Sequence, residues 1–114
     1  MNADGHRKKA EELRHAIMKL ASEPEEDVAA IVELAFGMCH HLLASASERR
    51  FGRHIDSHAG MSGLLRENGE PVIAAEFDLL GTLRQGRFYG GKGDGTTVRK
   101  VLEIMESIGR WERQ

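Results

Sequence analysis

Apolar residues recur along most of the chain at steps of three and four, the spacing of one face of an α-helix. The first such stripe consists of Ala10, Leu13, Ile17, Leu20 and Ala21. It predicts a helix over roughly residues 6–21. Ser22 and Glu25 then have the spacing of a capping box, and Pro24 suits a first helical turn, so a second helix is predicted to begin near residue 23.

The second predicted helix is long and apolar on most of its sides. Its main stripe consists of Val28, Ile31, Val32, Ala35, Cys39, Leu42, Leu43 and Ala46. Glu33 is the single formal charge between Val28 and Ala46, and the pattern extends to about Ser47. Such a helix is either central to a bundle or covered by a second subunit, and its apolar surface predicts a homodimer with a twofold interface.

Turn residues separate two further helices. Asp56 or Ser57 can cap a short third helix, and Asn68-Gly69 is a typical helix stop because both residues tolerate left-handed backbone. Pro71 suits the first turn of a fourth helix.

The fourth helix has two apolar faces, and a last helix follows a glycine-rich loop. One face carries Ile73, Phe77 and Leu80 and continues to Arg84; the other carries Val72, Leu79 and Leu83. Gly81 inside this helix indicates a close helix–helix crossing or a kink. Thr96 can cap the last helix, which is expected to weaken at Gly109. The chain is therefore predicted to be all-α: an antiparallel up-and-down helical bundle of four long helices plus one short helix, forming a single domain over residues 1–114.

Composition narrows the function classes. The 114 residues carry a net charge of −2, which excludes a generally basic nucleic-acid coat. A single cysteine excludes an internal disulfide and a multi-thiolate zinc site. Neither a metal nor a cofactor is expected. No apolar run long enough for a membrane span and no secretory signal is read from the sequence, so a cytoplasmic protein that does not contact a membrane is expected.

Basic residues concentrate near the glycine loop. Residues 84–100 hold five bases against one acid, a local net charge of +4. Glycines let backbone approach a ligand, and a loop that leads into a helix N-terminus offers free N–H groups to phosphate. The candidate phosphate-binding residues are Arg84, Arg87, Tyr89, Gly90, Gly91 and Lys92. The alternative is a solvated turn between helices, with Arg84 paired internally to Glu76 or Glu103.

The histidines do not suggest a metal site. His40 and His41 are adjacent in a helix, so they diverge by about 100° and cannot both face one ion. Cys39 lies on the apolar stripe and is interpreted as a packing residue. His58 is expected to cap or anchor the third helix.

Two stretches resemble a known family. Residues 56–65, with His58, and residues 79–91, with Arg84, Tyr89 and Gly90, are similar to small prokaryotic HEPN proteins, the higher-eukaryote and prokaryote nucleotide-binding family. The resemblance covers roughly residues 25–108. It implies a helical bundle of four to five helices, often a homodimer, and either ribonuclease activity of the toxin type or partnership with a minimal nucleotidyltransferase.

The ribonuclease motif of that family is only partly present. It consists of an arginine followed after four to six residues by a histidine; Arg84 matches the arginine, but Tyr89 stands where the histidine is expected. Arg53 and His58 have the literal spacing but lie between the second and third helices. These departures favour a non-catalytic bundle that binds a nucleotide, RNA or a nucleotidyltransferase. One alternative is a metal-independent ribonuclease, in which an arginine such as Arg53 stabilises the transition-state charge and His58 or Tyr89 transfers protons. The other is an oligomerisation module without a ligand.

Overall fold

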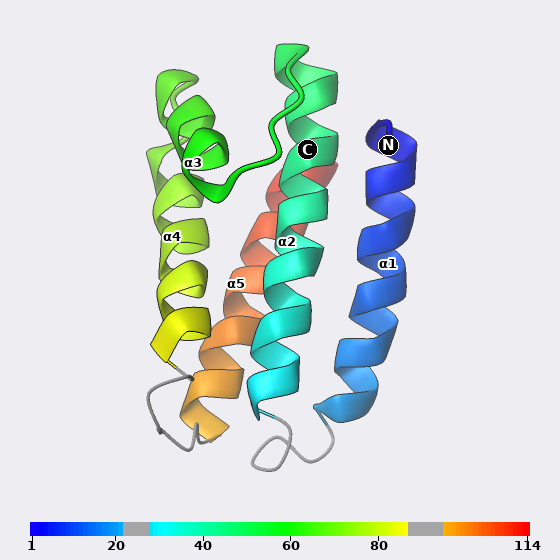
Figure 1. Ribbon diagram of the computed structural model, residues 1–114, viewed down its shortest axis with the longest axis vertical. Helices are drawn as coiled ribbons and strands as arrows, with labels where there is room; N and C mark the ends of the chain where they lie inside the picture. Colours follow the sequence, from blue (N-terminus) through cyan, green and yellow to red (C-terminus); the bar gives the residue numbers. More distant parts are fainter. Residues whose placement is uncertain (22–27, 87–94) are drawn as a thin grey trace.

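The computed structural model describes residues 1–21, 28–86 and 95–114. Within these ranges the chain is all-α, with no strand. Its helices are α1 (Ala3–Leu20), α2 (Val28–Phe51), α3 (His58–Glu67), α4 (Pro71–Gly86) and α5 (Gly95–Arg113). The four long helices alternate in direction, and short α3 lies beside the upper end of α4 (Figure 1). The predicted all-α class, with four long helices and one short one, is confirmed.

Helix α2 is the centre of the molecule. It packs against α1, α5, α4 and α3, and 12 of its 24 residues are buried. Cys39 is fully buried, as expected for a packing residue, and burial raises the pKa of its thiol. Because the other helices cover the apolar face of α2, that face is not the free surface from which a homodimer was predicted.

The predicted turn chemistry is present at both ends of α3. Ser57 is its N-cap, and the Ser57 hydroxyl accepts a hydrogen bond from the Gly60 backbone N–H at 3.0 Å. Asn68 is the C-cap, and Gly69 has a φ of +77°, a conformation that glycine adopts without strain. These two signals fix how α3 turns back onto α4.

Other helix ends differ from the prediction. Helix α1 begins earlier, at Ala3, because Asn2 caps it, and α2 continues to Phe51. Helix α5 begins at Gly95, so Thr96 lies inside its first turn instead of preceding it. The cap proposed for the second helix, around Ser22, lies outside the described residues.

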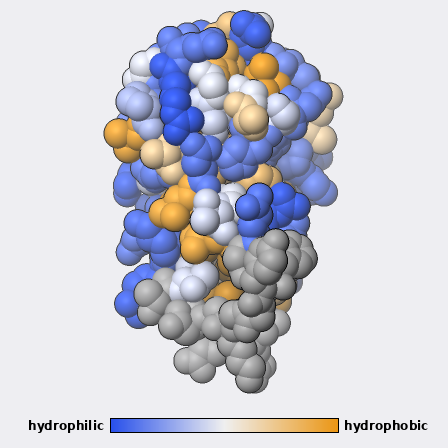
Figure 2. Space-filling view, turned by 60° about the vertical axis from the view of Figure 1, so that its left-hand side comes forward, coloured by the Kyte–Doolittle hydropathy of each residue, from blue (hydrophilic) through white to orange (hydrophobic). Residues whose placement is uncertain are grey.

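The expectation about membrane spans needs correction. Within the described ranges, α2 is long and apolar enough by length and composition to cross a bilayer, although just over half of its apolar window is buried in the bundle. The face that includes α3 and α4 shows small apolar spots separated by hydrophilic residues (Figure 2). The large hydrophobic side chains that are exposed in the described ranges are Met1, Met18, Val72 and Leu79.

Candidate functional site

A pocket of about 590 Å³ opens where α3 and α4 meet α2. It is lined by Phe36, His58, Ala59, Asp78, Gly81, Thr82, Arg84 and Gln85. The pocket therefore brings together two residues that the sequence singled out in separate segments, His58 and Arg84. Its size is in the range of small-molecule sites, about 300–1,000 Å³.

His58 is held by an acidic residue of α4. Its Nε2 lies 2.9 Å from Oδ1 of Asp78. The same Oδ1 accepts a hydrogen bond from the Ser62 hydroxyl at 2.5 Å, and Oδ2 accepts one from Arg66 at 2.7 Å. Burial raises the pKa of Asp78, but the three hydrogen bonds from Ser62, Arg66 and His58 outweigh it and lower the pKa to about 2. Asp78 is thus an anion at neutral pH and fixes the orientation of the imidazole.

The ring of His58 stacks on two phenylalanines, which also stack on each other at 5.2 Å. Its centroid is 4.2 Å from that of Phe77 and 5.3 Å from that of Phe36, and both pairs are stacked. A Cβ at Gly81 would lie 2.6 Å from Cε1 of His58. The structure therefore favours the close crossing over the kink as the reason for Gly81, because the imidazole fills the space that a side chain would need. The sequence-based role of His58 as an anchor of α3 agrees with this packing.

Gly81→Ala is expected to displace the His58 ring from Phe77 and to weaken its bond to Asp78. Crowding of this kind costs about 1–3 kcal/mol of unfolding free energy. Urea denaturation measures the loss, and the NMR signals of His58 report the displaced ring. Gly63→Ala is the matched control, because a Cβ at Gly63 in α3 meets nothing within 4 Å. Equal stability of the Gly81→Ala variant and the wild type would contradict the packing argument.

Arg84 is paired within the chain, but not with either acid considered from sequence. Its Nε lies 3.0 and 3.1 Å from the two carboxylate oxygens of Glu33, and a terminal guanidinium nitrogen lies 2.9 Å from Oε1. The guanidinium carbon is 4.6 Å from the ring centroid of Phe36. Glu76 instead accepts a bond from Ser107, so the expected Glu76 pairing is wrong.

The Glu103 alternative for Arg84 is also not observed. Glu103 lies 3.7 Å from Lys100, one turn away on α5. The arginine head is partly open to solvent, since the Arg84 and Glu33 side chains are 40% and 41% exposed. An ion pair this exposed contributes little to stability, about 0–1 kcal/mol.

The other candidate residues are not part of the described pocket. Arg53 is exposed in the connection between α2 and α3 and does not line it. Arg87, Tyr89, Gly90, Gly91 and Lys92 lie outside the described residues. Sequence reasoning missed Glu33, Phe36 and Asp78. The one available signal was that Glu33 is the single charge in an apolar stretch of helix, which indicates that it pairs with a basic side chain.

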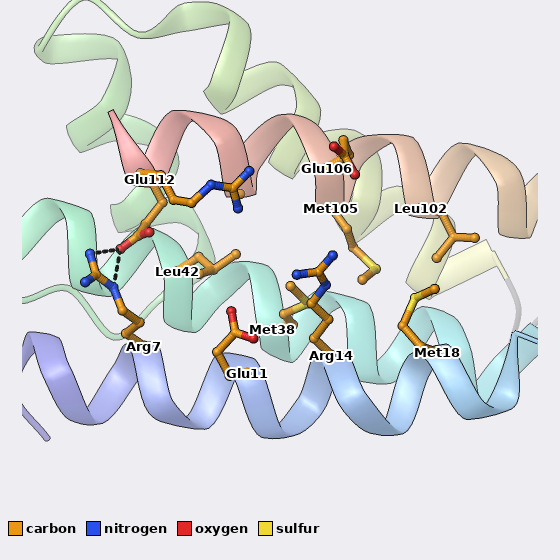
Figure 3. Close-up of a pocket in the computed structure, with 12 residues that line it drawn as sticks. Arg7, Glu11, Arg14, Met18, Met38, Leu42, Leu102, Met105, Glu106 and Glu112 are labelled. Atoms are coloured by element: carbon orange, nitrogen blue, oxygen red, sulfur yellow. Dashed lines mark hydrogen bonds and ion pairs between the residues drawn. The ribbon is translucent and has the colours of Figure 1, made fainter.

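A second pocket, of about 690 Å³, lies between α1 and α5 and is also lined by residues of α2. Figure 3 shows Met38 and Leu42 of α2 between the two outer helices, with Arg7 reaching Glu112 at one end. Within the part of the chain that is described, no group of three or more histidine, cysteine, aspartate or glutamate side chains is placed to hold a metal ion.

Comparisons of the chain with protein-family models, with curated proteins and with solved structures find no match. The resemblance to the HEPN family therefore stays a hypothesis. The functional inference depends on the geometry of the pocket that contains His58 and Arg84.

Proposed function

We propose that the chain is a HEPN-like bundle that binds the phosphate of a nucleotide or RNA at Arg84, without catalysis. The observation that supports this most directly is the state of the Arg84 guanidinium. Its central carbon lies 4.6 Å from the ring centroid of Phe36, it is partly exposed at a pocket, and it already holds a planar anion, the Glu33 carboxylate. A phosphate oxygen pair has the same acceptor geometry as that carboxylate.

The charge pattern of the sequence supports the same assignment. Arg84 is in the last turn of α4, and the basic, glycine-containing segment follows it directly in the chain. Arg87 and Lys92 supply two more cations within eight residues of Arg84. A phosphate that replaces Glu33 at Arg84 would gain from this local positive charge.

The order of the helices is consistent with the family resemblance. A long helix, a histidine-bearing turn, a short helix, a helix that carries an arginine near its end and a last helix follow one another as that resemblance implies. We extend the proposal to the partners that it implies: a second copy of the chain in a homodimer, and a minimal nucleotidyltransferase. Sedimentation at micromolar concentration tests the homodimer.

A second candidate function is a metal-independent ribonuclease. The observation that favours it is that His58 and Arg84 line one pocket and both lie against the ring of Phe36. Arg84 would stabilise the charge that develops on the phosphorus oxygens, and His58 would transfer the proton. Cleavage of an RNA with equal rates in the presence and absence of chelator, and its loss in His58→Ala, would replace the binding proposal with this one.

The binding proposal predicts different effects for two Arg84 variants. Arg84→Ala is expected to weaken the binding of a fluorescent RNA oligonucleotide by about tenfold or more, since a hydrogen bond to a charged group contributes about 1.5–3 kcal/mol. Arg84→Lys keeps the charge but loses the planar fork, so it should recover only part of the affinity. Binding should also weaken as salt rises, because ions screen the attraction between exposed charges; at physiological ionic strength the screening length is about 8 Å.

The control separates binding from stability. Arg14→Ala removes an exposed arginine from α1, outside the pocket, and should leave affinity unchanged. Arg84→Ala should change the unfolding free energy by less than about 1 kcal/mol, because the pair with Glu33 is half exposed. Loss of stability with unchanged affinity would show that Arg84 is structural and would overturn the proposal.

A further inference from the structure

A histidine pair joins the first turns of α1 to α2. His6 of α1 is only 7% exposed, and its Nδ1 lies 2.8 Å from Nδ1 of His41 on α2. Two ring nitrogens at this distance form a hydrogen bond only if one carries the proton and the other offers its lone pair. The contact therefore requires that at least one of the two rings is neutral.

Further titratable groups surround this pair. From the connection between α2 and α3, the ring of His54 stacks on His6 at 5.6 Å, while its Nε2 lies 2.8 Å from Asp56. From α2, Glu48 faces the same cluster. In the described part of the chain, Nε2 of His6 and Oε2 of Glu48 are the two buried side-chain polar atoms that have no hydrogen-bond partner. Both belong to this one cluster.

We propose that the His6–His41 contact is an acid-sensitive latch that holds the N-terminal turns of α1 against α2. The cluster has room for one added proton, because Nε2 of His6 is free and the Glu48 carboxylate favours charge on that ring. A second proton on His41 places an N–H on both Nδ1 atoms. Their hydrogen bond is then lost, and two cations face each other in a buried position.

The direction of the pH dependence follows from the environment. Burial is the main cause that lowers the pKa of His6; His41, His54 and the N-terminal amine lower it further, and Glu48 opposes them. Burial and Lys9 lower the pKa of His41. The latched state therefore binds fewer protons than the open state. Its stability is complete above the ordinary histidine pKa of about 6.5 and is lost as the pH falls through the lowered values.

The opening should be confined to one end of α1. Helix α1 packs mainly on α2, and Ile17, near its other end, is fully buried. Arg7, next to His6, bonds Glu112 of α5, so opening of this turn also separates α1 from α5. Acidification would therefore release the first turns of α1 and leave its C-terminal turns packed.

Amide hydrogen exchange of the full chain tests the latch. Between about pH 7.5 and about pH 5, after correction for intrinsic exchange rates, amides of residues 6–10 are expected to open up to about tenfold more often for each pH unit between the ordinary histidine pKa of about 6.5 and the lowered pKa. Amides of residues 16–20 should not change. An equal response of both segments would show global acid unfolding, and no response in residues 6–10 would show that no latch exists; either result overturns the proposal.

Three variants isolate the histidine pair. His41→Gln keeps a hydrogen-bonding side chain that does not titrate, and it should remove the pH response. His6→Phe keeps a ring in the buried position and provides a second test if His41→Gln folds poorly. His15→Gln is the matched control, because His15 is an exposed histidine of the same helix, and it should retain the full response. A response that persists in both His41→Gln and His6→Phe would refute the assignment.

Discussion

Glu112→Ala is expected to lower the unfolding free energy by about 3 kcal/mol, because it removes the shared anion of two arginines. The Glu112 side chain is 2% exposed. Its Oε1 accepts bonds from Arg7 at 2.8 and 3.0 Å, from Arg49 at 2.8 Å and from the Ser45 hydroxyl at 3.4 Å. Breaking a buried pair costs about 3–5 kcal/mol, and the lower end applies because both arginines keep contact with water.

The buried carboxylate joins three helices, which gives its loss a recognisable signature. Arg7 belongs to α1 and Glu112 to α5 (Figure 3), and Arg49 belongs to α2. Urea denaturation of Glu112→Ala should therefore show a lower midpoint with an unchanged slope. Glu106→Ala is the matched control on α5: its side chain is 60% exposed and 3.8 Å from Arg110, so its effect should stay within about 0.5 kcal/mol. Similar losses in both variants would contradict a special role for Glu112.

The fold could be predicted because its signals are local. The steps of three and four, Ser57 as a cap and Asn68-Gly69 as a stop act within one or two helical turns. The end of α2 was missed for the opposite reason. Between Ala46 and Phe51 its residues are polar or charged, and contacts with α5 replace the apolar pattern: Arg49 and Arg50 bond the backbone carbonyl of Glu112.

The candidate site could be predicted only in part, because its partners lie far apart in the sequence. Arg84 was placed correctly at the end of an apolar face, yet Glu33 is 51 residues away. A periodic pattern indicates which face a residue occupies. It does not indicate the axial offset and rotation between two helices, and these decide which acid an arginine reaches. The same limit applies to Asp78, 20 residues from His58.

The His6–His41 contact also could not be predicted from the pattern within one helix. The divergence of His40 and His41 within one helix was used against a shared ion, and no metal group is placed among the described residues. The angle between His40 and His41 within α2 does not indicate which side chains of other helices reach them. The bundle adds His6 from α1, whose Nδ1 lies at hydrogen-bond distance from Nδ1 of His41, so the two helices can share a proton.

Phe77→Ala, in the core next to the pocket, is expected to cost about 3–5 kcal/mol of unfolding free energy. The Phe77 ring is fully buried, and it stacks on Phe36 at 5.2 Å and on His58 at 4.2 Å. Its removal would leave a cavity beneath both rings. The substitution tests how the core positions the site, because His58 would lose its support while keeping its bond to Asp78.

Two further variants make this last test decisive. A domain of this size has about 5–15 kcal/mol of stability in total, so Phe77→Leu, which leaves a smaller cavity, provides a folded comparison if Phe77→Ala unfolds. Val72→Ala is the control, since Val72 lies on the same helix and is 67% exposed; its effect should be within about 0.5 kcal/mol. In Phe77→Leu, RNA affinity measured under folding conditions should fall, because Arg84 rests on Phe36 and Phe36 rests on Phe77. If stability falls as expected but RNA affinity is unchanged, the packing of Phe77 does not position Arg84. Arg84 would then be positioned by Glu33 alone.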